Sequence, residues 1–202
     1  MPKEVEIKFR ITDLNTVTKA LKRAGFREVT RSTHEINSLY DLPGQKLRKR
    51  GELLRLRKYG KEWVLTHKKK PTLAHRTRQD GAPAPGRHKV RVEFETRVES
   101  GEQMDAVLRA LGFAPTFRYE KYRAEWTDKT GHAVIDKTPI GTFGELEGPA
   151  RWIDRTAAAL GIAPTDYISQ TYADLFFTWK RAKGSAATEM TFQAIPAEPK
   201  KR

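Results

Sequence analysis

Several short segments of this chain alternate strictly between apolar and charged residues, and this alternation restricts the fold more than any other feature. In MPKEVEIKFRI, every second residue from Glu4 to Arg10 is charged, whereas every second residue from Val5 to Ile11 is apolar. Side chains along a β-strand point alternately to two faces, so this segment predicts a strand with one apolar and one charged face. Similar patterns predict strands at 33–41, 53–59, 62–68, 89–95, 120–126, 132–137 and 143–148.

Segments with a helical spacing of apolar residues lie between these strands. They cover residues 13–24, 102–111, 150–160 and 166–181. Asp13 is a candidate N-cap for the first segment, and glycines at 25, 112 and 161 are stop signals. Because each helix has one apolar stripe, we expect the helices to pack on the apolar faces of the strands.

A weak internal repeat relates two parts of the chain. A shift of 87 positions superposes Glu6 on Glu93, Leu21 on Leu108, and Gly25-Phe26 on Gly112-Phe113. Strand, helix, Gly-Phe and strand therefore occur twice in the same order. We expect a single domain of two related halves at 1–181, with a flexible insertion at 69–88 and a disordered tail at 182–202.

The chain is strongly basic, with 39 Lys and Arg against 25 Asp and Glu, a net charge of +14 and a pI near 10.0. This balance predicts an anionic partner such as a phosphorylated metabolite or a nucleic acid. Part of the excess positive charge lies in residues 67–91, which contain eight Lys and Arg and a single acidic residue, Asp80. A nucleic-acid contact, if the protein makes one, is expected through this segment.

Other features of the composition exclude several classes of protein. There is no cysteine, so disulfides and thiolate metal sites are excluded. No apolar run approaches the roughly 20 residues of a membrane span, and the chain begins directly in a strand without a secretory signal. We expect a cytoplasmic protein with no membrane contact, either a monomer or a homodimer.

Two environments are open to the charged faces of the strands. In an open antiparallel sheet they would face solvent, which is common, whereas in a closed barrel they would line the interior. The residue types favour the barrel, because like charges recur two residues apart on five strands: Glu4/Glu6, Glu93/Glu95, Glu145/Glu147, Arg55/Arg57 and Lys121/Arg123. Solubility alone does not require so many paired charges.

If these pairs converge, they restrict the chemistry of the site. Carboxylates within about 4–6 Å of one another cannot all stay ionised at low cost without a cation. Oxygen ligands suit Mg²⁺ or Mn²⁺, and arginine and lysine bind phosphate oxygens. The pattern therefore predicts a polyphosphate site, where catalysis consists mainly of positioning and charge neutralisation.

The order of the motifs resembles the CYTH superfamily, also called the triphosphate tunnel metalloenzymes. Glu4-Val-Glu6-Ile-Lys8 resembles the E-x-E-x-K signature near the N-terminus. Further family-like stretches follow in order: LYDLPGQKLRKRGELLRLR (39–57), Thr66-His67-Lys68, Glu93-Phe94-Glu95, LGFAPTFRYEKYR (111–123), Asp136 with GTFGELEG (141–148), and Tyr172 preceded by Thr171 in place of Ser. The resemblance covers about residues 2–178.

The resemblance implies an α+β fold, in which an eight-stranded antiparallel β-barrel forms a tunnel with helices packed outside. It implies a triphosphate-containing small molecule bound by Lys8, Arg55, Arg57, Lys68, Lys121 and Arg123. It implies Mg²⁺ or Mn²⁺ held by carboxylates from Glu4, Glu6, Glu93, Glu95, Asp136, Glu145 and Glu147, with Glu6, Glu145 and Glu147 favoured as direct ligands. Catalytic roles are assigned to Lys8, Glu6 and Asp136.

Three functions fit these features. The first is a metal-dependent triphosphatase acting on inorganic triphosphate or on a triphosphorylated organic molecule such as ATP. The second is a class IV adenylyl cyclase that converts ATP to cyclic AMP and pyrophosphate, since the family carries several activities on one fold. The third is a non-catalytic basic protein that binds nucleic acid or polyphosphate, which leaves the three acidic pairs unexplained because they would repel a phosphate backbone.

Overall fold

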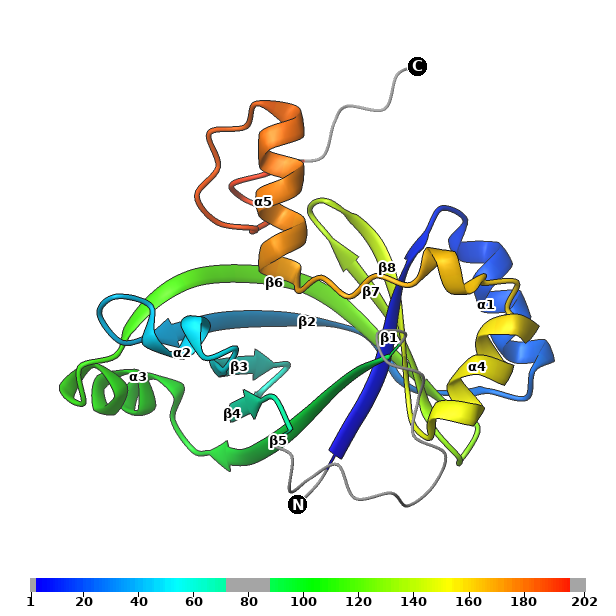
Figure 1. The fold of residues 1–202 in the computed structure, drawn as a ribbon, viewed down its shortest axis with the longest axis horizontal. Coiled ribbons are helices and arrows are strands. Elements are labelled where there is room, and N and C mark those ends of the chain that lie inside the picture. Colours follow the sequence, from blue (N-terminus) through cyan, green and yellow to red (C-terminus); the bar gives the residue numbers. More distant parts are fainter. Residues whose placement is uncertain (1–2, 72–87, 197–202) are drawn as a thin grey trace.

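The computed structural model describes residues 3–71 and 88–196, which form a closed antiparallel β-barrel (Figure 1). The strands follow the order β1-β5-β4-β3-β2-β6-β7-β8 around the barrel. Their bounds are β1 Lys3–Ile11, β2 Arg27–Asp41, β3 Leu53–Tyr59, β4 Glu62–Lys69, β5 Lys89–Val98, β6 Ala114–Thr127, β7 His132–Thr138 and β8 Gly141–Glu147. The predicted eight-stranded barrel is confirmed, and the open sheet is wrong. Most of the expected insertion at 69–88 lies outside the described residues.

Helices cover the apolar outer faces of the strands, as the sequence predicts. They are α1 Leu14–Arg23, α2 Lys46–Lys49, α3 Gly101–Ala110, α4 Ala150–Ala159, a 3₁₀ turn at Pro164–Asp166, and α5 Tyr172–Lys183. In Figure 1, α1 and α4 lie together beside β1, and α5 stands next to β6. The largest apolar cluster joins Ile7, Ile135 and Leu146 of the barrel to Leu21 and Ile153 of these two helices.

The ends of two helices reflect local chemistry. The Asp13 carboxylate accepts a hydrogen bond from the Asn15 backbone N–H at 2.9 Å, which confirms the predicted N-cap of α1. The helix predicted at 166–181 begins later, at Tyr172. Thr171 and Asp174 form a capping box there, so the preceding residues stay outside the helix.

The internal repeat of the sequence corresponds to two similar structural units, β1-α1-β2 and β5-α3-β6. Both helices end at a left-handed glycine, with φ of 87° at Gly25 and 86° at Gly112. In each unit the N–H of the following phenylalanine donates to the carbonyl of a buried leucine five residues earlier, at 3.0 Å. Glycine suits this position because it lacks the Cβ that penalises positive φ.

Residues 182–196 differ from the expected disordered tail. α5 extends to Lys183, and the chain then returns along β6. The Met190 N–H donates to the Arg118 carbonyl at 3.0 Å, and the Glu120 N–H donates to the Met190 carbonyl at 2.9 Å. The Met190 side chain is completely buried in a cluster that includes Phe117 and Phe176. The expectation of disorder is wrong for these residues, because this turn buries Met190 against α5 and β6.

Substitution of Met190 by Ala should therefore lower the free energy of unfolding by about 2–4 kcal/mol, because it leaves a cavity in a closely packed cluster. Urea denaturation followed by circular dichroism would measure the change. Gln193→Ala, in the same segment but exposed, is the control and should change stability by less than about 0.5 kcal/mol. Equal stability of the two variants would contradict the packing of this segment.

Candidate functional site: a charged cavity inside the barrel

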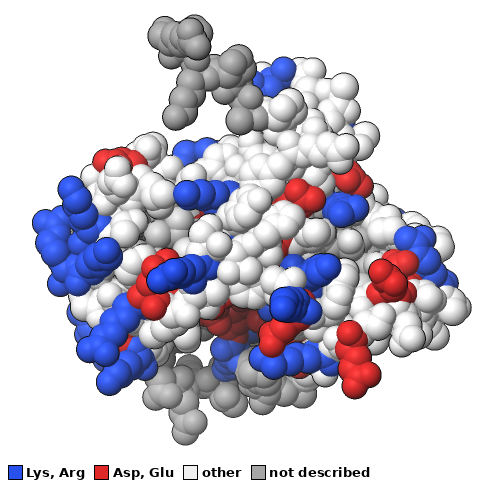
Figure 2. All heavy atoms as spheres, turned by 180° about the vertical axis from the view of Figure 1, so that it is seen from behind, with Lys and Arg blue, Asp and Glu red and all other residues white. Residues whose placement is uncertain are grey.

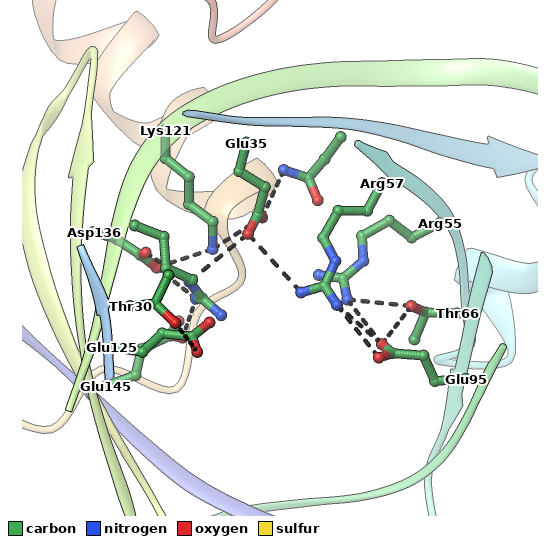
Figure 3. A network of polar contacts seen from close by, with 12 residues as sticks. Thr30, Glu35, Arg55, Arg57, Thr66, Glu95, Lys121, Glu125, Asp136 and Glu145 are labelled. Atoms are coloured by element: carbon green, nitrogen blue, oxygen red, sulfur yellow. Dashed lines mark hydrogen bonds and ion pairs between the residues drawn. The ribbon is translucent and has the colours of Figure 1, made fainter. Parts of the chain in front are cut away.

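The barrel encloses a cavity of about 590 Å³. Every residue assigned to the site from the sequence, except Asp136, lines this cavity. The charged faces converge because the side-chain alternation of each strand points them inward once the sheet closes. Figure 3 shows side chains from opposite walls pointing toward the middle of the barrel. Arg10, the last charged residue of β1, is not part of the lining and lies over the Phe143 ring instead.

One wall of the cavity holds three closely paired cations. Lys8 of β1 donates a hydrogen bond to Glu145, which lies directly opposite on β8. Arg123 Nη2 also contacts Glu145, at 2.7 Å. Although burial acts in the other direction, Lys8, Arg123 and Lys121 hold the pKa of Glu145 well below its ordinary value. Glu145 is thus an ionised partner that fixes the two cations beside it.

Asp136 lies behind this wall rather than in it. Its side chain is fully buried, and its carboxylate accepts hydrogen bonds from Lys121 at 2.9 Å, from Arg123 at 2.8 and 2.6 Å, and from the Tyr172 hydroxyl at 2.7 Å. Tyr172 begins α5, and its ring centroid lies 4.3 Å from Lys8 Nζ and 5.0 Å from Lys121 Nζ. Both oxygens of Asp136 are therefore engaged in holding cations of the cavity wall.

The neighbouring wall carries two arginines. Arg57 Nη2 lies 3.3 Å from both oxygens of Glu95, and Arg55 Nη2 lies 3.3 Å from the Thr66 hydroxyl. Thr66 in turn donates to Glu95 at 2.9 Å. Glu95 thus contacts the arginine pair, and its half-exposed side chain leaves this contact open to exchange with another anion.

Acidic residues gather on the side of β1, β5 and β8. Lys68 Nζ lies 2.7 Å from both oxygens of Glu4 and 3.2 Å from Glu93. Glu6 faces Glu147 across β1 and β8 and pairs with Lys89 at 2.7 Å. We call Glu4, Glu6, Glu93 and Glu147 the acidic cluster.

Glu147 differs from the other members of the acidic cluster. Its carboxylate forms no hydrogen bond or ion pair with any residue that the structure describes. Partial burial within the barrel raises the pKa of Glu147 to about 7, and the carboxylates of Glu4, Glu6 and Glu93 act in the same direction, against the opposing charge of Lys68. Water in the cavity still reaches the side chain, which is exposed. An added cation would relieve the repulsion at this point.

Comparison with known proteins identifies the family. Residues 2–161 match the CYTH domain. The chain belongs to the CYTH domain family. The resemblance seen in the ordered motifs is thereby confirmed.

Relatives of this CYTH protein carry two kinds of name. It is 29% identical over 145 residues to a Methanocaldococcus jannaschii protein named "putative adenylate cyclase", a match that covers 71% of this chain and 75% of that protein. A structure of the same description from Vibrio parahaemolyticus shares 19% identity with a TM-score of 0.70, covering 86% of this chain and 97% of the other. A Hippeastrum protein, described as a putative adenylyl cyclase with a dominant triphosphatase activity, shares 18% identity with a TM-score of 0.56. The match covers 87% of this chain and 95% of the Hippeastrum chain. At these identities the two structures show a shared fold.

The acidic cluster fits a divalent metal in its chemistry. All its donors are carboxylate oxygens, which Mg²⁺ and Mn²⁺ prefer, and the pKa of Glu147 is raised by burial and, to a lesser extent, by the neighbouring carboxylates. Within residues 3–71 and 88–196, however, no three acidic or histidine side chains already stand close enough to form a complete metal centre. Mg²⁺ commonly uses one or two carboxylates and completes its shell with water and substrate phosphates, so this arrangement suits such a metal.

Two charged residues that contact side chains of this CYTH cavity, Glu35 behind its wall and Lys89 in its lining, were missed in the sequence analysis. Glu35 of β2 is completely buried and lies 3.3 Å from Lys121 and 3.8 Å from both Arg57 and Arg123. Despite its burial, these cations lower the pKa of Glu35 to about 2. Lys89, the partner of Glu6, was counted only as part of a basic run. Extending the alternation rule to the strand at 33–41 would have placed Glu35 on the inner face.

No helix within the described parts of the chain is both long enough and apolar enough to cross a membrane.

Proposed function

We propose that this protein is a metal-dependent triphosphatase that hydrolyses the terminal phosphoanhydride bond of inorganic triphosphate or of a similar short chain. The observation that carries the proposal is the separation of charge within one cavity. Arginines and lysines paired with Glu95, Glu145 and Asp136 gather in one part of the cavity. The acidic cluster, whose four carboxylates share Lys68 and Lys89 and whose Glu147 has a raised pKa, lies in another. A triphosphate with bound metal has the same two faces, because its oxygens attract arginine and lysine while the metal attracts carboxylates.

The cations of this chain would bind and orient the phosphate chain. Arg55, Arg57 and Arg123 present planar guanidinium groups that match phosphate oxygens, and Lys8 and Lys121 add point charges. These groups are held by ion pairs with Glu95, Glu145, Asp136 and Glu35, so the protein itself fixes their positions. Such preorganisation lowers the cost of positioning a reacting phosphate.

The acidic cluster would hold Mg²⁺ or Mn²⁺ through Glu147 and its neighbours. When bound, the metal would neutralise phosphate charge and make a water molecule more nucleophilic. In the overall reaction, the water oxygen forms a bond to the terminal phosphorus, and the bond to the bridging oxygen breaks. Orthophosphate and pyrophosphate are the products from inorganic triphosphate.

Adenylyl cyclase activity is the second candidate, and the names of the Methanocaldococcus and Vibrio relatives favour it. A cyclase must also hold a purine. Among the residues that the structure describes, the apolar or aromatic lining of the cavity consists of Leu53, Tyr119, Val134 and Tyr172, apart from His132. Tyr172 is already covered by two lysine ammonium groups. The lining therefore favours a polyphosphate over a nucleoside, in agreement with the dominant triphosphatase activity ascribed to the Hippeastrum protein.

Nucleic-acid binding without turnover receives less support. On the face shown in Figure 2, basic side chains gather at the left edge, whereas elsewhere acidic and basic side chains are interspersed on a largely uncharged surface. A broad surface of one sign is the usual footprint for a phosphate backbone.

Product analysis by chromatography would test the proposal. The protein would be incubated with Mg²⁺ or Mn²⁺ and, separately, with inorganic triphosphate, ATP and thiamine triphosphate. We expect orthophosphate from inorganic triphosphate and no cyclic AMP from ATP. Cyclic AMP with pyrophosphate from ATP would instead identify a cyclase, and no product from any substrate with either metal would support the binding-only alternative.

A further inference from the structure

Lys89 is the first residue of β5, and its ammonium group enters the acidic cluster from the edge of the cavity. Its Nζ lies 2.7 Å from Glu6 Oε1, and the two residues are directly opposite in the β1–β5 register. Its side chain is about one-fifth exposed. Lys89 lies outside the set of phosphate-binding cations that the family resemblance implies.

The preceding residue fixes this position from the outside of the barrel. The His88 ring is almost completely buried, and its Nε2 lies 2.9 Å from Asp154 Oδ1 of α4. His88 directly precedes β5, so its contact with α4 anchors the start of this strand on the outside of the barrel. The register then places Lys89 opposite Glu6, with its ammonium group at the Glu6 carboxylate.

The Lys89–Glu6 pair lies within the acidic cluster, where the proposed function would place a divalent cation. Glu6 lies between Lys89 on β5 and Glu147 on β8, and Glu147 has no cation of its own among the described residues. Lys68 is already shared by Glu4 and Glu93. The partial exposure of Lys89 allows its ammonium group to leave for water at little desolvation cost.

We propose that Lys89 is a resident counter-cation for Glu6, which a divalent metal must displace, and that it thereby sets the metal affinity of the cavity. This rests on the proposed metal-dependent function. The ammonium group keeps Glu6 ionised and in place when metal is scarce. When Mg²⁺ or Mn²⁺ arrives, one positive charge leaves and two enter, so the charge of Glu147 is also compensated. Lys89 is therefore a positioning residue that raises the metal concentration required to load the site.

Direct measurement of Mn²⁺ binding would test this inference without relying on activity. Titration calorimetry, or the electron paramagnetic resonance signal of free Mn²⁺, would give the Kd of the wild-type protein and of Lys89→Met. We expect the variant to bind Mn²⁺ about tenfold more tightly. The substitution removes both the ion pair that competes for Glu6 and the positive charge of Lys89, which repels the metal. Lys89→Arg, which keeps the charge, should bind close to wild type.

Lys61→Met is the matched control. Lys61 is exposed in the turn between β3 and β4, and its substitution changes the net charge by the same amount as Lys89→Met. Its Mn²⁺ affinity should stay within about twofold of wild type. Unchanged or weaker binding by Lys89→Met would overturn the inference, with circular dichroism confirming that the variant is folded. If wild type and Lys89→Met both fail to bind Mn²⁺, the inference and the metal requirement fall together. If wild type and Lys89→Met hydrolyse triphosphate and bind Mn²⁺ with the same Kd, only the role of Lys89 is refuted.

Discussion

Replacement of Glu147 by Gln should reduce triphosphate hydrolysis at least about a hundredfold while leaving the barrel folded. Glu147 has no ion-pair or hydrogen-bond partner among the described residues, so its substitution breaks no interaction that the unliganded fold requires. It does remove a negative charge from the acidic cluster, where a metal would bind. Initial rates of orthophosphate release at pH 8 with Mn²⁺ would measure the loss. Glu99→Gln, on the exposed end of the same barrel, should keep full activity.

The same substitution has an effect on stability whose sign follows from the pKa of Glu147. The ordinary value is 4.5, and the folded protein raises it to about 7. Between these pH values the unfolded chain has released the proton that the folded protein still holds, so stability falls as the pH rises through this window. Glutamine cannot ionise and avoids this loss. The effect is smaller than the pKa shift alone implies, because water in the cavity screens the charges.

Urea denaturation of the metal-free protein would test the stability effect. Glu147→Gln should be more stable than wild type at pH 8, and the two proteins should be similar at pH 5, where Glu147 is neutral. Full hydrolytic activity of Glu147→Gln would refute the role of this carboxylate in the reaction. Equal urea midpoints at pH 8 would refute its raised pKa, independently of the reaction.

The barrel could be predicted from the sequence because its strands carry a strict two-residue period. The apolar face of the sheet must be covered by the apolar stripes of helices. The charged face must contact either solvent or a charged ligand, so few arrangements of strands and helices remain. The pairing of charges could not be predicted in the same way. Glu145 and Glu147 are two residues apart and look equivalent in FGELEG. Strand register places Glu145 opposite Lys8, which lowers the pKa of Glu145, and Glu147 opposite Glu6. The pKa of Glu147 is raised instead, first by burial and then by the carboxylates around it.

The residues that sequence reasoning missed depend on contacts between distant segments. Glu35 is enclosed by cations from β3 and β6. Lys89 is directed by the contact between His88 and α4. Met190 is buried only because the chain turns back after α5. Alternation along the strands could have placed Glu35 and Lys89 on the inner face, but their partners and the burial of Met190 depend on contacts between distant segments, for which a single sequence offers no direct signal.

Asp136→Asn should lower the free energy of unfolding by about 3–5 kcal/mol. The carboxylate is fully buried and accepts hydrogen bonds from Lys121, Arg123 and Tyr172. Asparagine keeps the size of the side chain but loses the charge, which leaves two buried cations with less compensation. Glu35 and Glu145 remain as their other partners, which places the loss toward the lower end of this range. Urea denaturation would measure it. The control Glu62→Gln, which weakens an exposed pair with Arg97, should cost less than about 1 kcal/mol.

The same variant decides between two roles for Asp136. The family resemblance makes Asp136 a metal ligand, whereas the geometry makes it a support for Lys121 and Arg123 behind the cavity wall. If it is a support, Asp136→Asn should bind triphosphate at least about tenfold more weakly while its Kd for Mn²⁺ alone stays unchanged. If it is a ligand, the Kd for Mn²⁺ should rise by about tenfold or more. Measured below the unfolding temperature of the variant, these two affinities separate the roles, because only a ligand affects metal binding in the absence of the phosphate chain.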